Sequence, residues 1–180
     1  MTLPALNMLK NTYKIILPVK PFLRGVLPFY ICCSLFWACD SNQVFDQNLD
    51  IPKYTWNVKY EPEFHVTITD TTRLYNVYIN IRHTRYYPYS NLWVNITTRF
   101  PDGLELQKRV ELPLADKNGR WYGTCLGDIC DLQVPIQERA YFNKTGEYMF
   151  RIKQIMRMDE LPAVMSIGLR LETSGERPVN

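Results

Sequence analysis

Residues 74–100, LYNVYINIRHTRYYPYSNLWVNITTRF, decide the fold class because apolar and polar side chains alternate on both sides of one interruption. The first half spaces four apolar side chains two residues apart: Tyr75, Val77, Ile79 and Ile81. The second half has a similar row: Leu92, Val94, Ile96 and Phe100. Successive side chains of a β-strand point to opposite faces, so this period of two predicts two strands that each bury one face. The interruption, YPYSN at 87–91, has the composition of a loop.

Working outward, the same alternation recurs in four other stretches: EFHVTITD (63–70), LELQKRVELPL (104–114), YMFRIKQI (148–155) and VMSIGLRLE (164–172). Polar segments rich in turn residues lie between these runs: DTT (70–72), PDG (101–103), DKNG (116–119) and NKTG (143–146). No convincing helical period is present. Strands at this spacing predict an antiparallel β-sandwich, which we place over residues 56–175.

Details at the ends and edges of this sandwich can also be predicted. Residues 39–55 are polar and aperiodic, so we expect a tether there, and we expect residues 176–180 to be a C-terminal tail. Pro113 and Pro135 cannot donate to a neighbouring strand, so their stretches are expected at sheet edges or bulges. The last strand has the cleanest inward-facing row: Met165, Ile167, Leu169 and Leu171.

The start of the chain has the pattern of a secretory signal peptide. Residues 25–39 form an apolar run of 15 residues without charge, and no acidic residue precedes Asp40. This run is shorter than the roughly 20 residues of a membrane-spanning helix, although a short uncleaved anchor is the alternative. The charges before the run are all basic: Lys10, Lys14, Lys20 and Arg24.

Ala38 and Cys39, at the end of the apolar run, resemble the lipobox of bacterial lipoproteins. Phe36 and Trp37 depart from the usual pattern of that motif. The resemblance implies cleavage after residue 38 and a diacylglycerol or acyl lipid on the Cys39 thiol. Residues 1–38 are therefore expected to be a lipoprotein signal peptide, and residue 39 to bind membrane lipid.

The cysteine count is compatible with this processing. Five cysteines are an odd number, which is awkward for an exported protein. If Cys32 and Cys33 leave with the signal and Cys39 carries lipid, only Cys125 and Cys130 remain. These two are expected to form a local disulfide or to stay as buried thiols. One such pair is weak support for zinc, which needs four ligands.

Charge and motifs exclude several function classes. The formal net charge is +3, and four of the positive charges lie in the leader, so residues 39–180 carry a formal charge of −1. Residues 39–180 therefore lack the excess of basic side chains that is typical of a nucleic-acid-binding domain. The chain also has no nucleophile elbow, no P-loop and no dinucleotide-binding glycine pattern. We therefore predict no enzymatic activity, no metal and no cofactor other than the lipid.

The titratable residues do not change this prediction. His65 and His83 are the only histidines, and both lie on predicted strands, where a structural role is favoured over that of a catalytic base. Asp116, Asp128 and Asp131 are candidates for a glycosidase carboxylate pair. All three lie in loop-like segments, where aspartate is an ordinary residue, so structural use is favoured.

Aromatic residues give the better functional lead. Tyr86, Tyr87 and Tyr89 cluster in RYYPYSN, and Trp93 follows on the polar side of its strand. Such residues stack on sugars or anchor a protein partner, so we expect an interaction surface there. The alternative is that Trp93 is covered by a loop or packs between strands.

Four blocks in this order resemble the gliding-motility lipoprotein GldH family of Bacteroidota: ITDTTRLYNVYINIRHTRYYPYSNLWVNI (68–96), FPDG (100–103), LADKNGRWYGTCLGDICD (114–131) and TGEYMFRIKQIMRMDELPAVMSIGLRLE (145–172). The resemblance covers most of residues 39–175, and none of the blocks is a catalytic motif. It implies an outer-membrane lipoprotein with a β-sandwich domain. It also implies partners among the envelope proteins of gliding motility and of the type IX secretion machinery.

Asp70-Thr71-Thr72 resembles the short O-glycosylation acceptor of exported proteins in Bacteroidota, with Thr71 as the attachment point. A plain turn explains the same three residues. Two hypotheses for the whole chain therefore follow. The first is a lipid-anchored, non-enzymatic interaction module, and the alternative is a surface glycan-binding β-sandwich lipoprotein.

Overall fold

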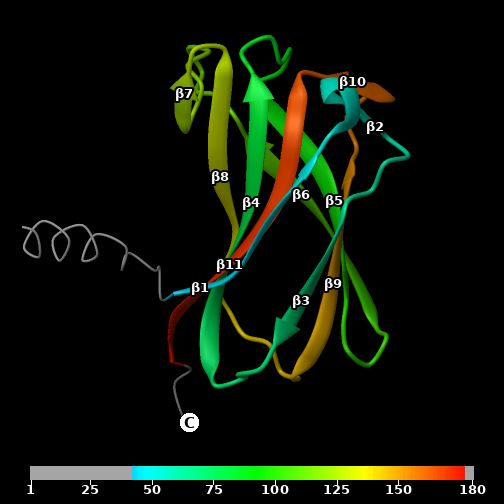
Figure 1. Cartoon of the computed structure of the whole chain (residues 1–180), viewed down its shortest axis with the longest axis vertical. Helices are drawn as coiled ribbons and strands as arrows, with labels where there is room; N and C mark the ends of the chain where they lie inside the picture. The colour runs from blue at the N-terminus through cyan, green and yellow to red at the C-terminus, as the bar shows by residue number, and fades with distance from the viewer. Residues whose placement is uncertain (1–41, 177–180) are drawn as a thin grey trace, which may run out of the picture. The chain divides into compact units, whose positions relative to one another are not determined.

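The computed structural model describes residues 42–176 and shows an all-β domain of antiparallel sheets, which confirms the predicted fold class (Figure 1). A five-stranded sheet has the order β1-β11-β4-β8-β7, a four-stranded sheet has the order β3-β9-β5-β6, and β10 pairs with β2. The elements are β1 (Gln43–Asp50), η2 (Pro52–Tyr54), β2 (Thr55–Asn57), β3 (Glu63–Ile68), β4 (Arg73–Thr84), β5 (Asn91–Arg99), β6 (Glu105–Pro113), β7 (Thr124–Leu126), β8 (Ile129–Ala140), β9 (Gly146–Gln154), β10 (Glu160–Pro162) and β11 (Val164–Glu176).

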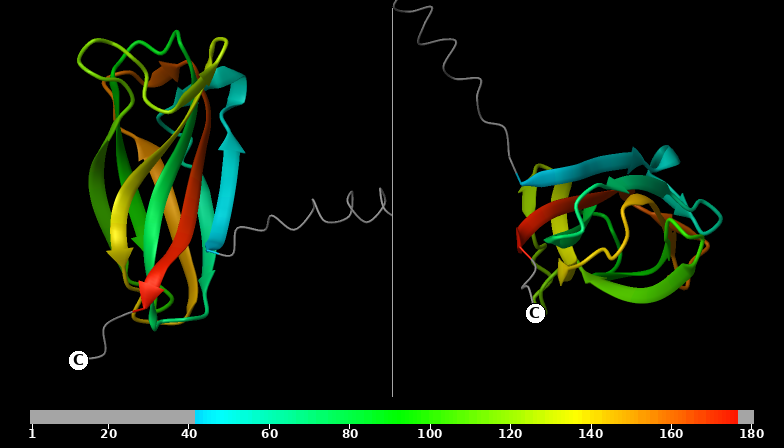
Figure 2. Two further views of the ribbon diagram at one scale, coloured as in Figure 1. Left: turned by 90° about the vertical axis from the view of Figure 1, so that its left-hand side faces the viewer. Right: turned by 90° about the horizontal axis from the view of Figure 1, so that it is seen from below.

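The two larger sheets face each other (Figure 2). The core between them contains the apolar rows predicted from the sequence. In β3, Phe64, Val66 and Ile68 are buried while the residues between them are exposed. The rows of β4 and β5 are buried in the same way: Tyr75, Val77, Ile79, Ile81, Leu92, Val94 and Ile96. Full burial of such a side chain contributes about 1.5–3 kcal/mol. The alternation therefore decides which face of each strand turns inward.

The predicted inner row of the last strand is wrong at one position. Met165 is only half-buried, and Val164 is fully buried in its place. The reason is a β-bulge between Val164 and Ser166, which shifts the pairing of β11 with β4. One extra residue in a bulge reverses the alternation of faces. After the bulge the row is as predicted: Ile167, Leu169 and Leu171.

Both prolines lie where a strand neighbour is missing or irregular, as predicted. Pro113 ends β6, the outer strand of the four-stranded sheet. Pro135 lies in β8, beyond the residues that pair with β7 and beside a register shift against β4. Residues 132–140 of β8 thus have no strand on that side within the described part of the chain.

The predicted tether over residues 39–55 differs from the structure. Residues 43–50 form β1, which pairs with β11 along its length. Most side chains of this edge strand face solvent, and only Phe45 and Leu49 are partly buried against the core. A strand with so little buried surface lacks the alternation by which strands are recognised in a sequence. The domain therefore extends back to residue 43 and does not begin at residue 56.

Candidate docking surface

The structure separates the four aromatic residues predicted to share an interaction surface. Tyr86 is 78% exposed, whereas Tyr87 is only 3% exposed, and Tyr89 and Trp93 are half-buried. Tyr87 therefore belongs to the core, and its prediction as a surface residue is wrong. Its hydroxyl donates to the carbonyl oxygen of Asn91 at 2.9 Å, so the buried ring keeps a hydrogen bond. Burial raises the pKa of the Tyr87 phenol well above its usual range.

Tyr87 is the centre of an aromatic cluster formed by His83, Tyr87, Tyr89 and Trp121. Its ring centroid lies 5.8 Å from that of His83 and 5.9 Å from that of Tyr89. The His83 and Trp121 centroids are 4.6 Å apart in an edge-to-face contact, a favourable geometry for aromatic rings. Sequence reasoning missed this cluster, because Trp121 comes from a distant loop and no local pattern brings it to His83.

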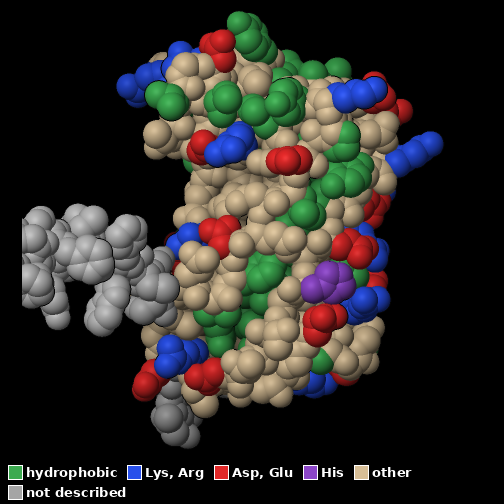
Figure 3. Space-filling view, viewed as in Figure 1, with side chains coloured by type: hydrophobic (Ala, Val, Ile, Leu, Met, Phe, Trp, Pro, Cys, Tyr) green, Lys and Arg blue, Asp and Glu red, His purple; other side chains and the backbone are tan. Residues whose placement is uncertain are grey.

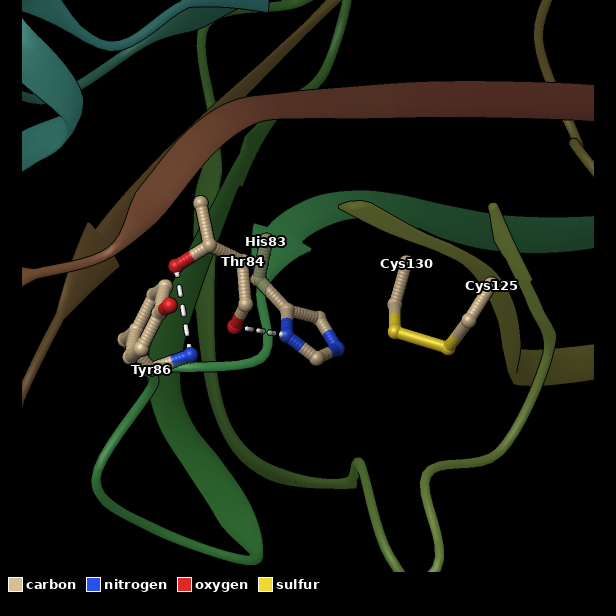
Figure 4. Close-up of a disulfide and its surroundings, with 5 residues drawn as sticks. All are labelled: His83, Thr84, Tyr86, Cys125 and Cys130. Atoms are coloured by element: carbon tan, nitrogen blue, oxygen red, sulfur yellow. Dashed lines mark hydrogen bonds between the residues drawn. A yellow bond between two sulfur atoms is a disulfide. The ribbon is translucent and has the colours of Figure 1, made fainter. Parts of the chain in front are cut away.

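His83 is fully buried and is held in one orientation (Figure 4). Its Nδ1 lies 2.9 Å from the carbonyl oxygen of Thr84, which can only accept, so Nδ1 carries the proton. Its Nε2 has no hydrogen-bond partner among residues 42–176. Burial lowers the pKa of this imidazole, so the ring is neutral at pH 7. His65, in contrast, lies on the exposed face of β3.

A disulfide joins Cys125 of β7 to Cys130 of β8, which lie directly opposite each other across a hairpin (Figure 4). The next pair toward the turn is Leu126 and Ile129. Leu126 is 87% exposed and Ile129 is 38% exposed. A covalent link this close to the turn restricts the conformations of the hairpin. Two exposed apolar side chains are therefore held on a constrained support.

Leu126 and Ile129 form part of a larger exposed surface, which we call the apolar end. Figure 3 shows several hydrophobic groups across the end of the molecule that includes β7, with charged side chains between them. The loop before β5 joins the hairpin turn through the backbone amide of Arg85, which donates to the carbonyl oxygen of Asp128 at 2.8 Å. Four residues define the apolar end: Tyr86, Tyr122, Leu126 and Ile129.

Trp93 lies in a separate cleft on the outer face of the four-stranded sheet. The guanidinium carbon of Arg109 lies 4.4 Å from the centre of the Trp93 ring, which is a cation–π distance. The Trp93 backbone amide donates to the Met156 sulfur at 3.3 Å. A cavity of about 340 Å³ is lined by the residues that define this Trp93 cleft: Tyr89, Trp93, Arg109, Ile155, Met156 and Arg157.

The carboxylates considered as a catalytic pair have structural partners or lie in turns. The Asp116 carboxylate accepts from the backbone and side chain of Arg120 at 2.9 and 2.8 Å, and these hydrogen bonds lower its pKa. Asp131 pairs with Arg82 at 2.6 Å, and Asp128 lies in the hairpin turn. Over residues 42–176, no group of acidic, histidine and cysteine side chains is arranged to hold a metal ion.

Of the two predicted modification sites, Thr71 lies within the described residues and Cys39 does not. Thr71 lies in the loop between β3 and β4, where the Asp70 carboxylate accepts from the amide and hydroxyl of Thr72 at 2.8 and 2.6 Å. This is the turn expected as an alternative, and glycosylation of Thr71 stays a prediction. Cys39 and the signal peptide lie outside the described residues. Within those residues, no helix has the length and apolar character of a membrane span.

Comparison with known proteins finds relatives over nearly the whole domain. The family described as GldH lipoprotein matches residues 43–171. The "Gliding motility lipoprotein GldH homolog" of Christiangramia forsetii is 30% identical over 157 residues, covering 83% of this chain and 96% of that protein. The "Gliding motility lipoprotein GldH" of Flavobacterium johnsoniae is 26% identical over 149 residues, covering 79% and 92%. A solved carbohydrate-binding module specific for non-crystalline cellulose aligns with 74% of this chain and 75% of its own at 9% identity, with a TM-score of 0.39. That similarity is too low to support an argument.

Proposed function

The chain belongs to the GldH lipoprotein family, and from this premise we propose that it is a non-enzymatic assembly component of the bacterial envelope. Lipid on Cys39 holds the domain at a membrane, and the apolar end binds another envelope protein. The relatives are named gliding motility lipoproteins. We further propose a role with the type IX secretion machinery and a location in the outer membrane.

The observation that carries the proposal is the exposure of Leu126 and its neighbours on a disulfide-constrained hairpin. Clustered exposed apolar side chains mark sites where another molecule binds. Aliphatic side chains such as Leu126 and Ile129 fit an apolar protein pocket, because they offer no hydrogen bonds to a polar ligand. A support that is already ordered also reduces the conformational entropy lost on binding.

The position of β1 supports this arrangement. Gln43 pairs with Glu172 near the end of β11, whereas Asp50 pairs with Ser166 near its start. The start of β11 lies beside His83, close to the disulfide. The strand β1 is 8 residues long, which at the usual rise per residue spans roughly 25 Å. The described domain thus begins far from the apolar end, and Cys39 precedes its first residue, Asn42, by three positions in the sequence.

Two variants in cells test the two parts of this function. Cys39→Ala is expected to abolish incorporation of labelled acyl chains and to mislocalise a folded domain, while Cys33→Ala leaves both unchanged. Leu126→Glu is expected to keep the lipid and the fold but to impair gliding or secretion, with Leu104→Glu as the exposed control. Acyl label that persists in Cys39→Ala contradicts the anchor, and normal gliding and secretion in Leu126→Glu contradict the docking role.

A second function, glycan binding, is favoured by the Trp93 cleft. The indole and the guanidinium groups of Arg109 and Arg157 line one cavity, and aromatic rings beside cations suit polyhydroxylated or acidic sugars. Titration of the purified protein with a glycan panel tests this function. Binding that is lost in Trp93→Ala, with the unfolding temperature unchanged, favours it over protein docking.

A further inference from the structure

The core of the sandwich is incompletely covered along one side. Neither β6 nor residues 132–140 of β8 have a further strand beside them in the described part of the chain. Lys108 of β6 bridges the two edges by donating from Nζ to the Gln137 side-chain oxygen at 3.4 Å. We call the space between these two edges the seam.

Small residual exposures show that the seam opens into the core. Four otherwise buried residues that line it are 4–8% exposed: Val77, Ile96, Phe142 and Phe150. Ile79 and Val94, two residues away on the same strands, are 0% exposed. The core is therefore less completely covered along the seam than at these neighbouring positions.

Backbone irregularities at the end of β8 account for the opening. The pairing of β8 with β4 shifts register twice between Tyr75 and Tyr78. Arg139 has a φ of 51°, and its amide donates to the side-chain oxygen of Asn76 at 3.0 Å instead of to a strand. Bulges bend the strand that carries them. The last residues of β8 consequently do not close against β6.

The seam contains an apolar cavity of about 200 Å³. An engineered cavity of about 150 Å³ with a similar lining stays dry and binds benzene, so this volume suits a narrow apolar group. Leu106 and Tyr141, each 59% exposed, extend the apolar lining to the mouth. Other lining residues come from both sheets: Phe100, Val110, Ile136 and Ala140.

One cation stands at this apolar mouth. Lys108 lies on the inward-facing side of β6, in the same row as Leu106, Val110 and the buried Leu112. Its ammonium group donates to the neutral side chain of Gln137, and no ion pair found within residues 42–176 includes it. An inward-pointing charge on an edge strand opposes pairing with another strand. The occupant therefore needs hydrocarbon for the cavity and one negative charge for Lys108.

We propose that the seam binds a medium-chain alkyl carboxylate, whose short hydrocarbon fits a cavity of about 200 Å³ and whose carboxylate lies against Lys108. Charge complementarity selects this occupant. The thioether glyceride expected on Cys39 has no negative head group, and an apolar protein side chain carries no charge at its end. The bound molecule is thus a fatty acid separate from the lipid on Cys39, and its binding is independent of what the apolar end binds.

Photolabelling of the full chain in lipid nanodiscs tests this proposal, with a diazirine-bearing octanoate as the probe. Adducts are expected to map to residues that line the seam, and excess octanoate is expected to compete better than excess octanol. Shorter competitors should lose roughly fourfold in potency per methylene, the equivalent of about 0.8 kcal/mol. Adducts spread over the surface in proportion to exposure contradict the proposal.

Matched variants separate the seam from general surface effects. Leu106→Glu is expected to reduce labelling at least fivefold, whereas Leu104→Glu, exposed but outside the lining, leaves it unchanged. Lys108→Glu removes the preference for carboxylate over alcohol, whereas Lys117→Glu keeps it. Unfolding temperatures are measured for all four, and Lys108→Met replaces Lys108→Glu if that variant is unstable.

Three results overturn the proposal. Labelling that Leu106→Glu leaves intact shows that the cavity is not the site. Labelling that rises severalfold in Cys39→Ala shows that the protein's own lipid fills the seam. A cross-link in cells from position 106 to a protein, without fatty acid in the seam, shows that a partner side chain occupies it.

Discussion

The apolar end and the outer face of the five-stranded sheet meet solvent in opposite ways. On the sheet face, charged side chains pair across strands, as Arg82 does with Asp131 at 2.6 Å and Arg170 with Asp46 at 2.8 Å. At the apolar end, the exposed side chain of Leu126 has no polar atom that could form an ion pair or a hydrogen bond. The sheet face therefore satisfies its own side chains, whereas the apolar end presents groups that only another molecule can cover. The docking surface is therefore recognised by its exposed apolar side chains and not by its charge.

The largest expected effect separates the support of the apolar end from its surface. Tyr87→Ala removes the centre of the aromatic cluster and is expected to lower the free energy of unfolding by about 3–5 kcal/mol. Tyr86→Ala, at the exposed neighbouring position, is expected to change it by less than about 0.5 kcal/mol. Urea unfolding of both variants measures the difference. Equal losses contradict the placement of one ring inside and one outside.

A smaller effect comes from the disulfide that constrains the hairpin. Replacing Cys125 and Cys130 together by alanine is expected to lower the free energy of unfolding by about 1–2 kcal/mol. Hydrogen exchange is expected to increase at the amides of β7 and the adjoining end of β8, and not on the outer sheet face. Unchanged protection of the hairpin contradicts a role for the disulfide in holding the apolar end.

The buried imidazole adds a dependence on pH. Burial lowers the pKa of His83 in the folded state below its ordinary value of about 6.5. The unfolded chain then binds a proton more readily, so stability decreases as the pH falls below about 6.5 and levels off below the folded pKa. His83→Phe should flatten this slope. An unchanged slope in His83→Phe shows that other groups cause it.

The smallest expected effect lies on the sheet face. Arg82 and Asp131 are each about half exposed, and such pairs contribute about 0–1 kcal/mol. A double-mutant cycle with alanine at both positions measures their coupling by thermal unfolding, at low and at high salt. A coupling well above 1 kcal/mol contradicts this prediction. It means that the Arg82–Asp131 pair stabilises the hairpin, so that the sheet face is not independent of the apolar end.

Much of the fold could be predicted because its core strands each bury one face. Rows such as that of Phe64, Val66 and Ile68 lie within one short segment of sequence. Their spacing of two residues shows directly that these side chains point to the same face of the strand. The predictions failed where burial was small or the backbone irregular. β1 buries too little to show alternation, and the bulge before Ser166 displaces Met165.

The candidate site was less predictable because it depends on contacts between distant loops. Adjacent tyrosines at 86 and 87 are chemically identical, and Tyr87 is buried by packing against His83, Tyr89 and Trp121. The hairpin signal was present in the paired cysteines on either side of a short turn, but the exposure of Leu126 follows from the absence of any covering segment in the described structure. The spacing of residues in the sequence does not reveal whether another segment covers a side chain.

Site-specific photocross-linking in living cells tests the central claim most directly. A photoreactive residue replaces Leu126 at the apolar end or Val44, an exposed apolar residue near the start of β1. The account predicts an adduct with one identifiable envelope protein from position 126 and not from position 44, and its loss when Tyr122 is also changed to glutamate. Adducts that are the same from both positions, or that contain only lipid from position 126, contradict the claim that the apolar end docks a protein.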